Sequence, residues 1–242
     1  SGRLLVGTTS ASGSNYLQVN SDALINGMTV GKGAGAVATN TAVGYQAIYT
    51  NANAGAVISA FGYQAAYSYN SSSYIDAFGY QALKNATGDG NAAFGSVAAT
   101  ATTTGASNSA FGVGSLYANT TGSYNAAFGC QAAYTGTTAT GIVAVGASAF
   151  YSVTTAANSV AVGREALYSD TTGESTVAVG YRALFSNTTA SNNTAVGYQA
   201  GYSNTTGNLD AFGYGALYAN TTGTENAAFG GVALYANTTG NA

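Results

Sequence analysis

A short triplet, Ala-Val-Gly or Ala-Phe-Gly, recurs twelve times along this chain. Its glycines follow one another at intervals of 16 to 18 residues, and most intervals are 17. They are Gly44, Gly62, Gly79, Gly95, Gly112, Gly129, Gly146, Gly163, Gly180, Gly197, Gly213 and Gly230. A unit of this length cannot bury an apolar face alone, so it must stack on its neighbours. The repeat therefore predicts a solenoid rather than an ordinary globular core.

Each triplet is predicted to form a β-strand that stacks in parallel on the next. Val and Phe favour a pleated, half-buried surface, and in-register stacking gives a Val ladder from Val145 to Val196. Phe ladders flank it, from Phe61 to Phe128 and then at Phe212 and Phe229. Glycine at the strand end permits a positive φ or the close approach of another backbone. Ala in the triplet and three residues after its Gly indicates tight packing, which we expect to be against sister chains.

The rest of each unit joins an apolar-aromatic segment to a polar turn. Five residues after the Gly, ten units carry Tyr or Phe, and Lys84 and Thr100 replace the aromatic ring in the other two. The segment before it, such as Tyr198–Tyr202, fits either one helical turn or a second strand. We expect a short strand and a tight corner that can include a helical turn. Polar stretches such as Asn220–Gly223 are typical of turns.

The predicted fold is therefore all-β, a parallel β-solenoid or β-roll of about 17-residue rungs, assembled as a trimer. Twelve rungs stacked about 4.8 Å apart would make a rod of about 55–60 Å. Residues 1–40 do not follow the repeat and are predicted to be a strand-rich lead-in or cap, with a turn at Asn26-Gly27. The solenoid is predicted to span residues 41–242. Because the last unit is incomplete, we expect the chain to be a piece of a longer polypeptide.

Composition argues against several function classes. Only 5% of the residues are charged, and the five cations are scattered, whereas nucleic-acid binding needs clustered Lys and Arg. No apolar run approaches the length of about 18 residues that a membrane-spanning helix needs. The chain has no His and one Cys, and its eight carboxylates are scattered. We therefore expect no enzyme activity, no catalytic residue, no metal and no cofactor.

The aromatic column is the best candidate for a binding site. An exposed Tyr can stack on a sugar, since its ring is apolar and its tip polar. The other interpretation is that these side chains pack between rungs or between subunits, and both remain open at this stage. The candidates for contact with a receptor or glycan are Tyr117, Tyr134, Tyr151, Tyr168, Tyr202, Tyr218 and Tyr235.

Three further motifs have structural interpretations. Glu165 and Arg182 both lie two residues after their Gly, one unit apart, so we expect an exposed ion pair between adjacent rungs. The Gly31–Gly35 segment resembles a phosphate loop, but no Ser or Thr follows Lys32, so we interpret it as a junction. Asn-Thr-Thr at residues 119, 187, 204, 220 and 237 matches the glycosylation pattern. Asp170 occupies the same column, which favours a turn.

Two segments of the chain resemble known protein families. Asn193–Ala200 (NTAVGYQA) and Gly2–Thr9 (GRLLVGTT) resemble tail-fibre proteins of bacteriophages, including those of marine and freshwater cyanobacteria. The resemblance implies a homotrimer that carries host recognition, often followed by a self-cleaving chaperone domain that nothing here matches. The Ala-Val-Gly rung is also similar to the head repeats of trimeric autotransporter adhesins, which form left-handed parallel β-rolls. Those repeats are a few residues shorter, so the Tyr-Gln-Ala-Leu-Tyr portion departs from them.

The sequence and this resemblance together predict a structural shaft or receptor-binding segment of a phage tail fibre. Its expected place is extracellular, in the virion tail, and its expected partners are two further copies and a host-surface glycan or protein. The alternative is a bacterial surface adhesin or extracellular filament built on the same repeat. A depolymerase is a third, more distant hypothesis.

Overall fold

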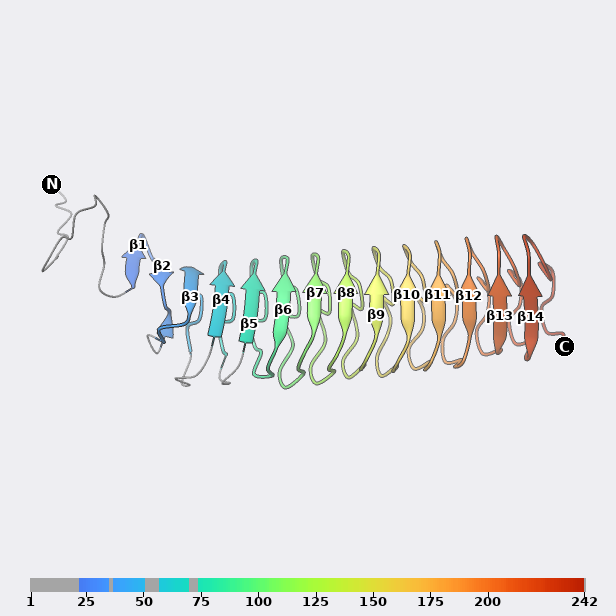
Figure 1. Ribbon diagram of the computed structural model, residues 1–242, viewed down its shortest axis with the longest axis horizontal. Helices are drawn as coiled ribbons and strands as arrows, with labels where there is room; N and C mark the ends of the chain where they lie inside the picture. Colours follow the sequence, from blue (N-terminus) through green and yellow to red (C-terminus); the bar gives the residue numbers. More distant parts are fainter. Residues whose placement is uncertain (1–21, 35–36, 51–56, 70–73, 242) are drawn as a thin grey trace, which may run out of the picture.

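A computed structural model of the chain describes residues 22–34, 37–50, 57–69 and 74–241. These residues form strands and turns and contain no α-helix. Fourteen strands make one sheet in which each strand pairs with its neighbours in the sequence. Figure 1 shows them side by side in a single row, from the blue N-terminal strands to the red C-terminal rung. The prediction of an all-β parallel solenoid with rungs of about 17 residues is confirmed.

The first two strands form a hairpin, and the other twelve are the rungs of the solenoid. Their bounds are β1 Ala23–Ile25, β2 Met28–Gly31, β3 Thr41–Gly44, β4 Val57–Phe61, β5 Tyr74–Phe78, β6 Asn91–Phe94, β7 Ser109–Phe111, β8 Ala126–Phe128, β9 Val143–Val145, β10 Val160–Val162, β11 Val177–Val179, β12 Thr194–Val196, β13 Leu209–Phe212 and β14 Asn226–Phe229.

The hairpin covers the N-terminal edge of the stack. β1 and β2 are antiparallel and meet at Asn26 and Gly27, whose φ values of 56° and 84° suit a tight two-residue turn. β2 then pairs antiparallel with β3, whereas each later pair is parallel. Of the strand material expected before the turn, residues 17–21 lie outside the described residues. The hairpin thus occupies a sheet edge that would otherwise be open to pairing with another chain.

Parallel stacking places like residues on like. The pairs include Phe94 with Phe111 and Val160 with Val177, and each central Ala pairs with the Ala of the next rung. The Phe and Val ladders expected from the sequence are therefore present in the described rungs. Successive Phe rings stack with their centroids 4.6–4.9 Å apart.

The core is narrow and built mainly from Ala. In a typical rung the central strand residue Ala161 is fully buried, as are Ala166 and Leu167, and all three belong to one core cluster. Our expectation that these small residues face sister chains is wrong, because what packs so closely on them is the far side of the same coil. Small side chains are required there because one short rung encloses little volume.

The corner after each strand is neither a helical turn nor a second strand. Two positions in it have positive φ, as at Glu165 (58°) and Leu167 (50°). The N–H of Glu165 donates to the Ala147 carbonyl of the preceding rung, whereas that of Leu167 donates to the Ala183 carbonyl of the following rung, both at 3.0 Å. This alternation lets the corner bond to both neighbouring rungs, which an isolated helical turn could not do.

Polar side chains continue the stack through the rest of each rung. Asn204 and Asn220 donate through Nδ2 to the Oδ1 atoms of Asn187 and Asn204, both at 3.1 Å. The Thr171 hydroxyl donates to the Thr188 carbonyl one rung further on at 2.9 Å, and this bond recurs along the Thr column. These bonds satisfy buried polar groups and hold the turns in register.

The column of strand-end glycines sets the spacing of the rungs. Gly129 has φ of 144°, and a Cβ on it would lie 2.5 Å from the Gly146 carbonyl oxygen of the next rung. The other strand-end glycines also have positive φ, between 124° and 144°. All of them except Gly230, the last, meet the next rung in the same way.

We predict that Gly129→Ala lowers the free energy of unfolding by about 3 kcal/mol or more, from backbone strain together with overpacking. Gly231→Ala is the matched control, because a Cβ there meets nothing within 4 Å, and its effect should stay within about 0.5 kcal/mol. Urea unfolding followed by circular dichroism compares the two. Equal midpoints for both variants would show that the Gly contact does not limit the stack.

Candidate functional site

The aromatic column forms a continuous stack of rings along the rod. From Tyr117 to Tyr235, successive rings lie 4.9–5.3 Å apart and are nearly parallel. All seven predicted contact residues belong to this stack, together with Phe185. Each ring between the two ends is covered on both faces by a neighbouring ring. What these residues present outwards is therefore ring edges and hydroxyl tips rather than open faces.

A second aromatic column was missed by the sequence analysis. It comes directly after the strand-end Gly and contains Tyr45, Tyr63 and Tyr80 near the hairpin and Tyr181, Tyr198 and Tyr214 further on. Tyr214 is 62% exposed, more than any described Tyr of the first column. The signal was a Tyr that follows the Gly in six units. It was overlooked because in the other six units this position is filled by unrelated residues.

A polar ladder borders the second column near the hairpin. Gln64 Nε2 donates to Gln46 Oε1 at 2.8 Å, and Gln81 Nε2 donates to Gln64 Oε1 at 2.9 Å. At the start of the ladder, Gln46 lines one surface hollow together with Tyr45 of the second column and Tyr49 of the first. Amides beside aromatic edges can donate and accept hydrogen bonds, which suits hydroxyl-rich ligands.

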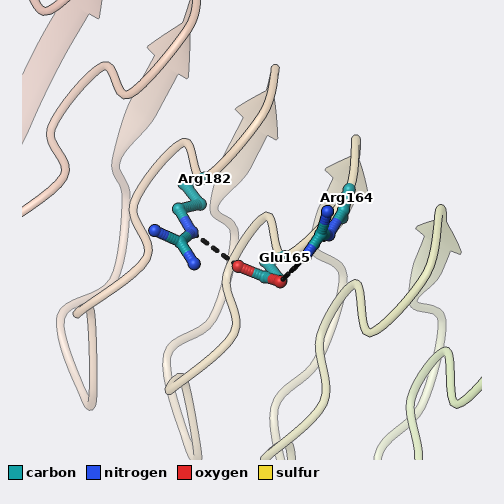
Figure 2. A network of polar contacts seen from close by, with 3 residues as sticks. All are labelled: Arg164, Glu165 and Arg182. Atoms are coloured by element: carbon teal, nitrogen blue, oxygen red, sulfur yellow. Dashed lines mark hydrogen bonds and ion pairs between the residues drawn. The ribbon is translucent and has the colours of Figure 1, made fainter.

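The predicted ion pair between adjacent rungs is confirmed, but it is half-buried rather than exposed, because the Glu165 side chain is only 14% exposed. Arg182 Nε lies 2.5 Å from Glu165 Oε2, and Arg164 reaches the other carboxylate oxygen from the same rung as Glu165 at 3.0 Å (Figure 2). The hydrogen bond from Arg182 is the main reason that the pKa of Glu165 is lowered. The Arg182 guanidinium also lies 5.1 Å from the ring centres of Tyr181 and Phe185. The network joins two rungs at the surface and leaves no free carboxylate for acid–base chemistry.

Asp170 is an acid with no exposed surface, set in the Asn column. Its Oδ1 accepts from the Gly173 N–H at 2.7 Å, and its Oδ2 accepts from Asn187 Nδ2 at 3.1 Å. The rung before it carries Val153 at this position, which offers no donor. Burial raises the pKa of Asp170 to about 6, against these hydrogen bonds, which lower it.

The Asn-Thr-Thr motifs are turns, as Asp170 suggested. The Asn119, Asn187, Asn204 and Asn220 side chains are fully buried. Each donates through Nδ2 to a carbonyl three residues on, as Asn204 does to Gly207 at 2.8 Å. An amide in this position is closed to a glycosylating enzyme in the folded rod. In the last rung, by contrast, Asn237 is only half-buried.

The glycine-rich junction binds a carboxylate of the chain itself. The Lys32 and Gly33 N–H groups donate to the two oxygens of Asp22 at 2.6 and 2.8 Å. The donors that could have held a phosphate are therefore occupied, and they fasten the start of β1 to the end of β2.

Other features associated with sites are not found in the described part of the chain. It contains no group of three His, Cys, Asp or Glu side chains arranged for a metal ion. Nor does it contain a helix able to cross a membrane. Cys130 is exposed and unpaired.

We predict that Asp170→Asn raises the free energy of unfolding at pH 7 by about 2–3 kcal/mol, because two pKa units correspond to about that amount. The folded-state pKa of Asp170 lies above its ordinary value of 3.8, so the folded chain binds the proton more tightly than the unfolded chain. Stability of the unsubstituted chain should therefore rise as the pH falls from about 7 to about 4. An Asn at 170 could donate through Nδ2 to the Gly173 carbonyl three residues on, as Asn119 and Asn204 do in their own units, and it would continue the Asn ladder.

The matched control is Asp210→Asn on β13, where the side chain is exposed. Urea unfolding at a series of pH values should show a gain for the Asp170 variant that disappears near pH 4, and none for the control. A gain that does not change with pH would mean that the carboxylate is not destabilised by burial.

Comparisons with protein-family models, with curated proteins and with solved structures give no significant match. The geometry of the rungs and their surface columns is therefore the basis for assigning a function.

Proposed function

We propose that this chain is a structural shaft or receptor-binding segment of a bacteriophage tail fibre that mediates attachment to the host. The observation that carries the proposal is the uninterrupted stack from β3 to β14, in which each rung bonds to the next through backbone and side chains. Such a stack transmits force along its length without a hinge. A rod of this kind serves as a spacer or stalk, and an outward side chain can add binding.

The chemistry of the side chains also supports a structural role. The internal Asn and Thr groups are used in rung-to-rung hydrogen bonds, and the best-connected carboxylate, Glu165, is neutralised by two Arg. These side chains hold the rod together and are not free to act on a substrate. We accordingly propose no enzymatic activity and no cofactor.

The resemblance of the repeat to phage tail-fibre proteins supports the viral assignment, an extracellular site in the virion tail and a homotrimer. For the host receptor, a surface glycan or protein, we propose the two Tyr columns and the Gln ladder as the contact region. Hydroxyl tips and amides line that surface, and hydrogen bonds to sugar hydroxyls suit it better than stacking on ring faces.

A bacterial surface adhesin or extracellular filament is the second candidate. It is favoured by the similarity of the Ala-Val-Gly rung to autotransporter head repeats, and by the same mechanical argument. The two candidates differ in where the chain should be found: on the tail of a phage particle or on the surface of a bacterial cell.

Immunogold electron microscopy with an antibody against the purified chain tests the proposal. Labelling of tail appendages on phage particles is the expected result. Labelling of stalks on bacterial cells would overturn the viral assignment in favour of the adhesin, and labelling confined to the cell interior would overturn both. Antibody preabsorbed with the purified chain is the control.

A further inference from the structure

The outer face of the strands is a largely apolar stripe along the rod. It consists of two rows, the residue before the central Ala of each strand triplet and the residue after it. The row before the Ala is mixed and includes six polar side chains: Thr41, Ser59, Asp76, Ser109, Thr194 and Asp210. The residues after the Ala form the Val and Phe ladder, of which Val145 is 36% and Phe128 41% exposed. We call this surface the outer strand face. The corners and turns that close each rung place their side chains on other sides of the coil.

This face differs chemically from the other outward columns. The Tyr columns end in hydroxyl groups that water can solvate, whereas the ladder from Val43 to Phe229 contains no polar side-chain atom. From β6 to β12 the outer strand face carries no charge, and its two acids are Asp76 and Asp210 nearer the ends. The described cations, Lys32, Lys84, Arg164 and Arg182, belong to other columns.

The stripe is as large as the largest apolar patches that monomers expose. With a Phe side chain of about 200 Å², a partly exposed ladder of seven Phe and five Val leaves on the order of 500 Å² of apolar surface. Val143, Val160 and Val177 in the neighbouring row increase it. The total approaches the roughly 800 Å² that each partner contributes to a standard protein interface. It lies at the upper end of the roughly 300–600 Å² of the largest apolar patch on a soluble monomer, a size that often has a function.

We infer that the outer strand face is the surface through which copies of this chain pack on one another. This inference rests on the proposed function, since it names the surface that would hold the fibre together. A second copy fits the stripe because its ladder has the same spacing over the same number of rungs. Phe rings 4.6–4.9 Å apart require a partner with matching ridges, which a globular protein does not offer over twelve rungs. The scarcity of charge removes a cost that self-association would otherwise have to overcome.

The test compares the oligomeric state of the chain with that of two double variants. Val145→Lys with Val179→Lys places like charges on the outer strand face of each copy, at outward positions that leave the core intact. Val113→Lys with Val232→Lys is the matched control, because these Val are 54% and 53% exposed but lie one and two residues after the strand-end Gly, outside the two rows that define this face. Sedimentation equilibrium gives the mass, and circular dichroism and the melting temperature report the fold.

We expect the unsubstituted chain and the control to sediment as a multiple of 23.8 kDa. The strand-face variant should be folded and associate about a hundredfold more weakly or worse, because buried like charges are costly. Val145→Thr with Val179→Thr, which keeps the β-branched shape, should weaken association less. This series keeps the test valid even if the Lys variant unfolds.

A monomeric unsubstituted chain, or a strand-face variant that associates as tightly as the control, would overturn the inference. So would a monomer that floats with phosphatidylcholine vesicles only when the outer strand face is unsubstituted, which would assign the face to lipid. These results concern the purified chain alone. Labelling of virions or cells can therefore succeed while this inference fails, and the reverse is also possible.

Discussion

The close approach of successive rungs at the glycine column is the constraint on which the rest of the structure depends. At Gly129 a Cβ would lie 2.5 Å from the next carbonyl oxygen, and the φ of 144° there is one that residues with a side chain rarely adopt. With each rung fixed against the next in this way, the turn after the strand starts at the same place each time. Every later residue of the rung then falls above its equivalent.

Like-on-like stacking turns single side chains into columns, and different columns stabilise the coil in different ways. Inside, Ala and Leu fill a narrow core, while Asn and Thr link rung to rung through hydrogen bonds. Asp170 shows what a charge costs in the polar column: like an Asn it accepts from the Asn of the next rung, and it also accepts from the Gly173 N–H, but burial of its charge raises its pKa to about 6. Asn204 and Asn220 make the rung-to-rung bond at equivalent positions without a charge, so the charge of Asp170 is a cost rather than a function.

The outside of the coil presents surfaces of two kinds, and this contrast is the basis for separating assembly from recognition. The outer strand face is largely apolar and nearly uncharged, which suits burial against another copy. The Tyr columns and the Gln ladder are amphipathic and carry hydrogen-bonding groups, which suits a hydrated ligand. A rod built in this way can assemble along one side and make contacts along another, without changing its core.

The sequence by itself determined the period, the parallel strands, the ladders, the Asn turns and the pairing of Glu165 with Arg182. Each of these follows from residue spacing, because a fixed repeat brings equivalent positions one above the other. Only the tertiary structure decided which way the side chains point. Alternation along a strand assigns Ala and Val to opposite sides but does not say which side is inside. The path of the corner, with positive φ at Glu165 and Leu167, closes the coil over the Ala side. That closure buries the small residues, turns the Phe and Val ladder outwards, and covers the faces of the Tyr rings with one another.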